Sequence, residues 1–326
     1  MRLRSVLMKA GLVLASIAIA LFIAEGALRM VGYTYTPLRI TVLTRTDLRM
    51  YHAFQQTDFA YDPVLIWRPR NGATIFNAQG YRGVEVPPAK PPGQIRIVTL
   101  GDSNTLGWPG EGAPSWPTSL QRIFTERRQP VVVINAGVWG YSSFQGLQRF
   151  REMLAFAPDV ALVSFGANDG HHVVTSDKDF SERRVRKMRM DEFLHLTRVG
   201  QAVLAILDRG GRAAPERLVP RVNLDEYREN LQKMIALGRE RNVRLVLLTR
   251  PFTGESPSPL WWKHFAPQYN RLTIELGRQE GVPVIDVAGY YQQHPEWMVD
   301  ESHFNQAGHE AMARLVYDDL ERLLPK

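Results

Sequence analysis

The fold is decided by one stretch, Ile95-Arg96-Ile97-Val98-Thr99-Leu100-Gly101-Asp102-Ser103-Asn104-Thr105. Its first six residues are mostly apolar and β-branched, which predicts a strand buried on both faces. Gly101 then allows a sharp turn, because a residue without a Cβ has access to backbone angles that others avoid. Ser103 follows at the carboxyl end of the strand, where open α/β sheets bind ligands. Two interpretations are open from this stretch alone: Ser103 is a nucleophile, or it is a helix N-cap.

The same kind of strand recurs along the chain in alternation with helical periodicity. Strands are predicted at 95–100, 131–135, 160–165, 244–249 and 283–287. Helices are predicted at 118–128, 144–157, 224–241, 266–280 and 307–324. Short apolar strands separated by helices are typical of the α/β class, with a doubly wound parallel sheet between two helical layers.

One segment, residues 170–222, interrupts this alternation. It contains a helical stripe of apolar residues at Phe193, Leu196, Val199, Val203 and Leu207. The segment leaves the chain just after the third predicted strand, beside the expected ligand-binding edge. It is interpreted either as a lid or as a surface excursion that packs on the domain.

The N-terminus, residues 1–31, has the composition of an export element. Positive residues precede an uncharged run, Ala10 to Ala24, which becomes long enough to span a bilayer if Lys9 and Glu25 reach the head groups. The charge layout predicts that the bulk of the chain lies outside the cytoplasm. A retained single-pass anchor is favoured over a cleaved signal peptide, whose site would be Ala24-Glu25-Gly26, and over a buried core helix.

The remaining chain divides into two parts by composition. Residues 32–93 have mixed character and end in a proline-rich linker, so we expect a stalk or brace rather than an independent core. Residues 94–326 form the main domain.

The whole chain of 326 residues carries a net charge of +7 with scattered basic residues, apart from the run 183–189. That run is interpreted as a solvated helix face or as a patch attracted to anionic lipid or envelope polymer.

Several site types are excluded or disfavoured by residue content. The chain has no cysteine, which excludes disulfides, a thiolate nucleophile and a lipoprotein anchor. It has no nucleic-acid-binding signature, so no nucleic-acid partner is expected. Asp169, His171 and His172 lie close together, but without further spaced ligands they are a weak metal signal, and we expect no metal.

Catalysis by a serine requires a base, a carboxylate that orients it and donors for an oxyanion. Asp300 and His303 stand three residues apart in a loop before the last helix, where the carboxylate can hold one ring nitrogen and leave the other for Ser103. Glu301 is a less suitable orienting residue, and His309 falls inside the helix. Gly137 and Asn168 follow the second and third strands and can donate N–H groups.

A pair of tryptophans, Trp261 and Trp262, follows the fourth strand. They are candidates for substrate contact at the edge of the cleft, or for ordinary packing.

Together the motifs resemble the four sequence blocks of the SGNH (GDSL-type) hydrolases. The resemblance rests on Gly101-Asp102-Ser103, Gly137, Gly166-x-Asn168-Asp169 and Asp300-x-x-His303, in that order. It implies a flavodoxin-like five-stranded sheet. It also implies Ser103 as nucleophile, His303 as base, Asp300 as its orienting partner, and Ser103 N–H, Gly137 and Asn168 as the oxyanion hole. Asn104 stands where relatives carry other residues, a departure expected to matter little. The N-terminus resembles a bacterial membrane-anchored subgroup.

The function that follows is a serine esterase outside the cytoplasmic membrane that needs no cofactor. Its substrate is expected to be an acylated small molecule, glycan or lipid. Alternatives are an O-acetyltransferase acting on envelope polysaccharide, a lipid or lysophospholipid esterase, and a glycan-binding protein without catalysis.

Overall fold

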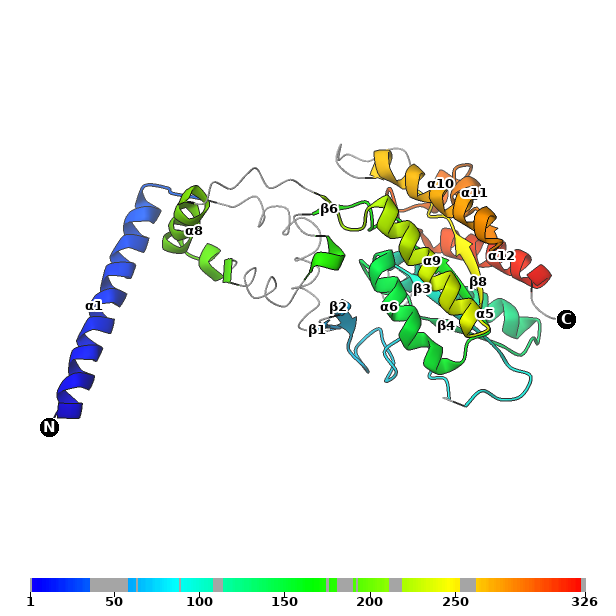
Figure 1. Cartoon of the computed structure of the whole chain (residues 1–326), viewed down its shortest axis with the longest axis horizontal. Coiled ribbons are helices and arrows are strands. Elements are labelled where there is room, and N and C mark those ends of the chain that lie inside the picture. Colours follow the sequence, from blue (N-terminus) through cyan, green and yellow to red (C-terminus); the bar gives the residue numbers. More distant parts are fainter. Residues whose placement is uncertain are drawn as a thin grey trace. The chain divides into compact units, whose positions relative to one another are not determined.

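The structure is a computed structural model, and it describes residues 2–35, 58–62, 64–87, 89–107, 114–173, 176–180, 190–191, 193–210, 219–252 and 262–323. The chain divides into two compact units (Figure 1). One unit consists of residues 1–49 and 180–217, and the other of residues 50–179 and 218–326. Each is described here by itself.

The larger unit is built on a five-stranded sheet in which every pairing is parallel. The strand order is β4-β3-β5-β8-β9, and the strands are β3 (Ile95–Gly101), β4 (Val131–Asn135), β5 (Val160–Ser164), β8 (Arg244–Leu248) and β9 (Val284–Ile285). The chain therefore starts inside the sheet, turns to one edge and then crosses to the other side, which is the flavodoxin-like order. The carboxyl ends of β3 and β5, next to the point where the order reverses, form the expected ligand edge.

Helices cover both faces of this sheet. They are α4 (Ser103–Leu106), α5 (Trp116–Glu126), α6 (Ser143–Met153), α9 (Leu224–Glu240), α10 (Trp262–Glu280), α11 (Val287–Tyr291) and α12 (Gln306–Leu323). The predicted α/β class and parallel sheet are confirmed, and the element bounds differ from the predicted ones by a few residues at most places.

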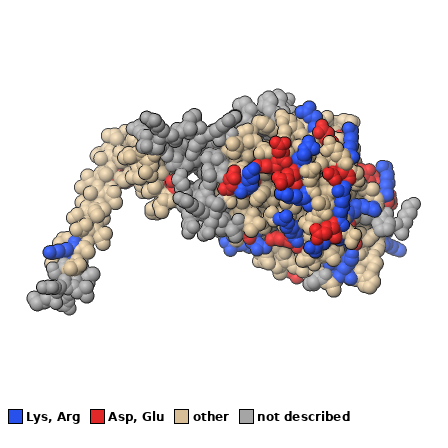
Figure 2. Space-filling view, in the orientation of Figure 1, with Lys and Arg blue, Asp and Glu red and all other residues tan. Residues whose placement is uncertain are grey.

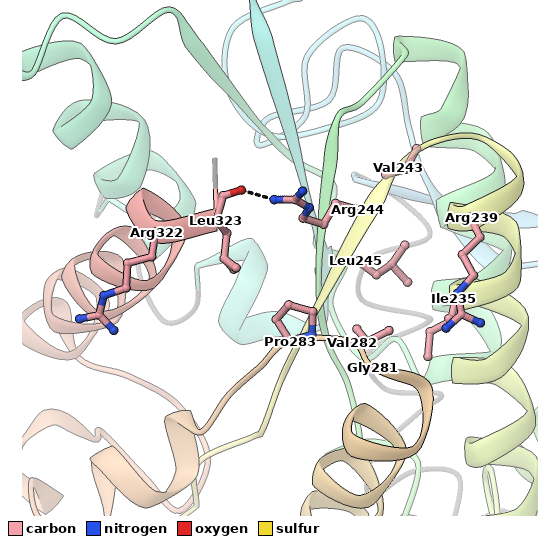
Figure 3. A pocket seen from close by; sticks show the side chains of 10 residues that line it. All are labelled: Ile235, Arg239, Val243, Arg244, Leu245, Gly281, Val282, Pro283, Arg322 and Leu323. Carbon is pink, nitrogen blue, oxygen red and sulfur yellow. Dashed lines mark hydrogen bonds between the residues drawn. The ribbon is translucent and has the colours of Figure 1, made fainter. Parts of the chain in front are cut away.

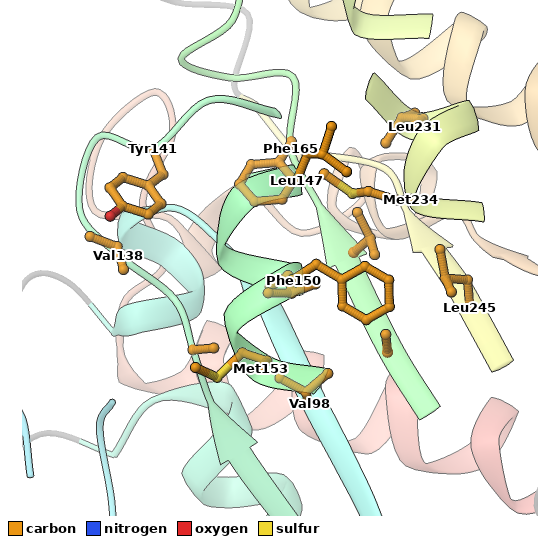
Figure 4. Packing of buried hydrophobic residues seen from close by; sticks show 14 of the residues in the cluster. Val98, Val138, Tyr141, Leu147, Phe150, Met153, Phe165, Leu231, Met234 and Leu245 are labelled. Carbon is orange, nitrogen blue, oxygen red and sulfur yellow. The ribbon is translucent and has the colours of Figure 1, made fainter. Parts of the chain in front are cut away.

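Two hydrophobic cores lie on opposite faces of the sheet because alternate strand residues point to opposite sides. In Figure 4, Phe150 and Met153 of α6 pack toward Val98 of β3, with Met234 of α9 and Leu245 of β8 in the same cluster. The other core joins α5, α11 and α12 to the alternate strand residues, among them Ile97, Leu162 and Val246. These two cores fix the sheet, and thereby the loops at its carboxyl edge.

The segment that precedes the main domain packs on the first of these cores. Its hairpin pairs β1 (Phe59–Asp62) with β2 (Ile66–Pro69), and Phe59 and Tyr81 are buried in the same cluster as α6 and β3. Sequence periodicity did not predict this hairpin, because each strand has only four residues. A second short ribbon, β6 (His172–Val173) with β7 (Val219–Pro220), joins the two ends of the predicted insertion.

The smaller unit contains helices α1 (Arg2–Met30) and α8 (Arg198–Gly210), and residues 190–191 and 193–195 are also helical. Residues Met8–Met30 of α1 are long and apolar enough to cross a membrane, with a mean hydropathy of 2.2, and their position near the N-terminus also fits a signal sequence. The middle of the predicted insertion therefore belongs to the same unit as the apolar N-terminal helix.

Candidate active site

The serine lies at the junction of β3 and α4. Asp102 is the N-cap of α4, and its Oδ1 accepts a hydrogen bond of 3.0 Å from the backbone N–H of Asn104. Ser103 is the first residue of the helix and is 5% exposed. A side chain at Gly101 would collide with Thr105 and come within 2.9 Å of the carbonyl oxygen of Ser164. Glycine is therefore required here by the close approach of neighbouring chain segments, and not by the special backbone angle predicted from the sequence.

The histidine lies in a tight loop before α12. The backbone N–H of Val299 donates to the carbonyl of His303 at 2.8 Å, which closes the loop. Inside it, Asp300 Oδ1 accepts the backbone N–H groups of Ser302 and His303, each at 2.8 Å. This turn holds the Asp300 carboxylate against the imidazole, with Oδ2 2.8 Å and Oδ1 3.0 Å from Nδ1.

The serine and histidine loops meet. Ser103 Oγ lies 2.9 Å from His303 Nε2, across 200 residues of sequence. Because a carboxylate only accepts, Asp300 assigns the ring proton to Nδ1 and leaves Nε2 to accept from the serine hydroxyl. The structure therefore brings together all three residues named from the motifs, in the order alcohol, imidazole, carboxylate. Glu301 does not take the place of Asp300.

The charge of the carboxylate is favoured by its surroundings. Partial burial by itself would raise the pKa of Asp300, but the hydrogen bond and charge interaction with His303 and the two backbone N–H groups outweigh it. The net effect lowers the pKa of Asp300 to about 2. The group therefore stays ionised at neutral pH and can stabilise a protonated imidazole.

The expected oxyanion donors differ in how strongly their N–H groups are already hydrogen-bonded within the protein. Asn168 Nδ2 donates to the carbonyl of Tyr141 at 3.0 Å, and its other contact, to Asp102 Oδ2, is long at 3.5 Å, which leaves one amide hydrogen weakly held. The N–H of Gly137 donates to Asn135 Oδ1 at 3.0 Å. Ser103 begins a helix, and the first N–H groups of a helix lack intrahelical acceptors.

The residue next to Asn168 anchors this loop. Asp169 is fully buried, and it accepts hydrogen bonds from Ser143 Oγ at 2.5 Å and from the backbone N–H of Gly166 at 3.0 Å. Burial raises the pKa of Asp169 to about 6, against the opposing effect of these hydrogen bonds. Asp169 therefore holds the loop that carries Asn168 in place, a structural role that the sequence motif alone did not explain.

Asn104 links the two loops directly, contrary to the expectation that this departure matters little. Its Nδ2 donates to the carbonyl of Ser302 at 2.6 Å, and its Oδ1 accepts from the N–H of Phe304 at 3.1 Å. The two contacts fall on either side of His303. The amide thereby fixes the backbone of the histidine relative to the helix that carries the serine.

Arg250 is a second residue that sequence reasoning missed. It follows β8, and both Nε and Nη2 donate to Asp102 Oδ2, at 3.1 and 2.9 Å. The side chains are 5% and 1% exposed. An unpaired carboxylate beside Ser103 would oppose negative charge in the site, and the guanidinium offsets it. The pairing spans 148 residues of sequence, so no local pattern could reveal it.

The N-terminal brace also reaches the site. Arg82 Nη1 donates to the carbonyls of Leu106 and Gly107 at the end of α4, at 2.7 and 3.1 Å. A cation at a helix C-terminus satisfies carbonyls that lack intrahelical partners. Arg82 therefore helps to hold the short helix whose first residue is Ser103.

Other residues considered from the sequence lie elsewhere or outside what can be described. Trp261 is outside the described residues, and Trp262 begins α10. His309 Nδ1 accepts from the N–H of Trp116 at 3.3 Å, a packing role in α12. In the described parts of the chain, His171, His172 and Asp169 are not joined by further ligands into a group of three or more that could hold a metal.

A cavity of about 580 Å³ lies at the amino ends of the strands, opposite the ends that precede Ser103 and Arg250 (Figure 3). Its lining includes Arg244 at the start of β8 and Pro283 just before β9, together with Arg239 and Arg322. Arg244 donates to the carbonyl of Leu323, as drawn in Figure 3. The cavity is therefore at the amino ends of the strands, whereas Ser103 and Arg250 follow their carboxyl ends.

Comparison with known proteins bears on the same domain. The chain is 37% identical over 76 residues to an arylesterase from Vibrio mimicus, a match that covers 23% of this chain and 38% of that protein. The lipase/acylhydrolase from Enterococcus faecalis superposes with a TM-score of 0.51 over 71% of this chain and 98% of its own, at 23% identity, which shows a shared fold. The model of the GDSL-like lipase/acylhydrolase family matches residues 99–311. That range includes Ser103 and His303 and most of the parallel sheet. The chain belongs to the GDSL-like lipase/acylhydrolase family.

Proposed function

We propose that this protein is a serine esterase that hydrolyses O-acyl esters through Ser103, His303 and Asp300. The observation that carries the proposal is the unbroken series of contacts from Ser103 Oγ to His303 Nε2 at 2.9 Å and from His303 Nδ1 to Asp300 at 2.8 Å. A nucleophile within hydrogen-bond reach of a base, and a base oriented by a third group, is the arrangement that acyl transfer to serine requires.

The first half of the reaction forms an acyl-enzyme. Ser103 Oγ attacks the ester carbonyl carbon while His303 Nε2 takes the hydroxyl proton, and the carbonyl oxygen becomes an oxyanion. When the tetrahedral intermediate collapses, the C–O bond to the alcohol breaks and His303 returns the proton to the leaving oxygen. Asp300 stabilises the imidazolium between these two steps because its low pKa keeps it charged.

The second half repeats the sequence with water. His303 removes a proton from water, the hydroxide attacks the acyl carbon, and Ser103 leaves as the protonated hydroxyl. The oxyanion is stabilised by the N–H of Ser103 and by the amide of Asn168. The N–H of Gly137 joins them by sharing its hydrogen between Asn135 and the substrate oxygen. Each such donor contributes about 3 kcal/mol to lowering the barrier.

The N-terminal helix supports an anchored enzyme with its catalytic domain outside the cytoplasmic membrane. Arg2, Arg4 and Lys9 precede most of the apolar span Met8–Met30, a layout that favours an N-terminus inside. The helix runs without a break through Ala24-Glu25-Gly26 to Met30, and Glu25 is bonded to α8. Cleavage at that position would disrupt this contact, so we infer a retained anchor. The substrate class is an acylated glycan or lipid of the cell envelope.

The test combines a variant with a covalent probe. Ser103→Ala should reduce hydrolysis of a short-chain nitrophenyl ester by 10⁴-fold or more, on the order seen when a catalytic serine is removed, with an unchanged circular dichroism spectrum. A fluorophosphonate should label the wild-type protein at Ser103, as located by peptide mass, and should leave the variant unlabelled. Hydrolysis that survives in the variant, or labelling at another residue, would disprove the assignment. The intact mass of the protein from membranes reports whether the anchor is retained.

A further inference from the structure

Helix α8 exposes an apolar stripe that a protein in water would bury. The structure breaks the predicted stripe at residues 196–197, so that only Val199, Val203 and Leu207 lie on α8. Val203 and Leu207 are exposed, Val199 is partly buried, and Phe193 and Leu196, which precede the helix, are exposed. Ile206, on the same side, is 68% exposed. No charged residue occurs between Val199 and Leu207. We call Val203, Ile206 and Leu207 the outer face of α8; the exposed Phe193 and Leu196 lie just before the helix begins.

The opposite side of α8 is the one that packs. Gly200, Gln201, Leu204 and Ala205 are buried, at the spacing of one helical face. The helix is therefore apolar on two sides, and the protein covers only one of them. Residues 202–207 are apolar on every side of the helix, which is typical of surroundings less polar than water.

This helix is attached to α1 by defined hydrogen bonds. Glu25 Oε2 accepts the backbone N–H of Val199, in the first turn of α8, at 2.9 Å. Gln201 Oε1 accepts the backbone N–H of Tyr35, just beyond the end of α1, at 3.1 Å. Glu25 Oε1 also accepts from Arg29 Nε at 2.7 Å. Figure 1 shows the two helices side by side, and both belong to the same compact unit. A carboxylate at the first turn of a helix is favourable, because the free N–H groups there carry partial positive charge.

The position of Glu25 along α1 sets the depth of α8 in a bilayer. Glu25 precedes the last residue of the candidate span, Met30, by five positions. At about 1.5 Å per residue this places the contact roughly 8 Å inside the end of the span. Interfacial helices bury their apolar face about 5–10 Å into the boundary between head groups and acyl chains, which is the same depth.

We propose that the outer face of α8 lies in the lipid interface of the leaflet at which α1 ends, so that the insertion is a second membrane contact beside the anchor. The proposal rests on the retained anchor of the proposed function. The occupant is lipid, because α8 is bonded to the candidate span at Glu25 and has no charged residue between Val199 and Leu207. Figure 2 shows the described atoms of α1 and α8 mostly free of charged residues on the face in view, whereas the larger unit is densely covered with both signs of charge.

The chain offers a clean way to measure this contact, because it contains no cysteine. Single cysteines introduced as Ile206→Cys, Ile17→Cys and Glu229→Cys carry a nitroxide label in the full-length protein. Ile17 lies in the candidate span, and Glu229 is an exposed residue of α9 with 61% side-chain exposure. The labelled proteins are reconstituted in vesicles of phosphatidylethanolamine and phosphatidylglycerol. Collision rates with oxygen, which enriches in lipid, and with a water-soluble nickel chelate are compared by electron paramagnetic resonance.

The expected result is an oxygen-to-nickel collision ratio at position 206 several-fold above that at position 229 and near that at position 17. A ratio at 206 equal to that at 229 would place the outer face in water and overturn the proposal. A label at 206 that is immobilised and shielded from both reagents would overturn it in favour of a second copy or another protein.

The labels distinguish removal of the N-terminal anchor from the absence of a lipid contact at α8. If the N-terminal helix has been removed, the intact mass shows it and no signal is obtained at position 17, and the lipid contact of α8 falls with the anchor. If position 17 reports lipid and position 206 reports water, the anchor stands and only the α8 interface is wrong. Hydrolysis of a nitrophenyl ester by the same labelled proteins reports the esterase proposal separately.

Discussion

The two edges of the parallel sheet, at the amino and carboxyl ends of its strands, each have a side-chain amide that makes a pair of backbone hydrogen bonds. The residue held between the two bonds differs. At the amino edge, the amide of Gln121 donates to the carbonyl of Val131 at 3.0 Å and accepts from the N–H of Val133 at 2.7 Å. At the carboxyl edge, the amide of Asn104 makes the same pair of bonds to residues 302 and 304. The residue between the two bonds is Val132 in one case and His303 in the other.

The contrast extends to the spaces at each edge. The amino edge has a hollow of about 580 Å³, and the arginines around it bond to Leu323, Glu280 and Asp319. At the carboxyl edge, Asp102, Ser103 and Arg250 are buried and bonded to one another or to the histidine loop. The two edges therefore differ in what they gather: a hollow with paired arginines at one, and converging buried polar groups at the other. The following predictions test this difference between the edges.

The largest effect is expected from Asp300→Asn at the carboxyl edge. An amide can donate to Nδ1 of His303 and so favours the wrong tautomer, and we expect kcat/KM for a nitrophenyl ester to fall on the order of 10³–10⁴-fold. Because the pKa of Asp300 is lowered to about 2, the carboxylate is ionised throughout the range above about pH 4. Any loss of activity of the wild-type protein between that pH and neutrality therefore reports another group. A variant with activity near that of the wild type would remove Asp300 from the mechanism.

The next effect concerns stability and the pair between Asp102 and Arg250. Arg250→Met leaves a buried carboxylate without its partner, and we expect the free energy of unfolding to fall by about 3–5 kcal/mol. The control is the double variant Asp102→Asn with Arg250→Met, in which both charges are gone and much of the loss should be recovered. Urea denaturation followed by tryptophan fluorescence measures both. Equal stability of the single variant and the wild type would contradict a structural role for the pair.

A smaller effect on catalysis separates the two amide contacts. Asn104→Leu removes both bonds that flank His303, and misplacement of the base should lower kcat by about 10–100-fold with little change in KM. Gln121→Leu removes the same pair of bonds around Val132 and should cost stability without lowering kcat. Steady-state kinetics and thermal denaturation of both variants give the comparison. Equal losses of kcat would mean that Asn104 acts only through general stability.

The smallest effect is expected at the amino-edge cavity. Arg239 is exposed and pairs with Glu280 at 2.9 Å, so Arg239→Ala should change the free energy of unfolding by no more than about 0.5 kcal/mol. Ester hydrolysis should be unchanged. A clear loss of activity in this variant would show that the hollow at the amino edge takes part in the reaction and that the contrast between the edges is wrong.

The elements that the sequence predicted share one property: their signal is local. Strand β5 and helix α9 were predicted from the alternation of short apolar strands with helical stretches, and a capping box of Asn223 and Glu226 begins α9 in the structure. The residues Ser103, Asp300 and His303 were found from short motifs, and the structure brings them within hydrogen-bond distance. Each of these inferences needed only a few neighbouring residues.

The features that the sequence did not reveal depend on distant partners. Asn104 and Arg250 have ordinary local surroundings, and their importance comes from bonds to residues 302 and 102. The stripe on α8 was recognised, but periodicity cannot tell whether an apolar face meets a protein core or another medium. Trp261 lies outside the described residues, so its contact with substrate stays a prediction.

The bonds of Arg82 have a practical consequence for anyone who works with this enzyme. The proline-rich segment before β3 suggests a shortened protein that begins at about residue 94, close to residue 99, where the match to the family begins. Such a shortened protein would lack the guanidinium that closes the end of α4, and it would also lose Phe59 and Tyr81 from the interior. Low ester hydrolysis by that fragment would then result from the lost support of α4, the helix that carries Ser103. It would not reveal which esters the whole chain accepts.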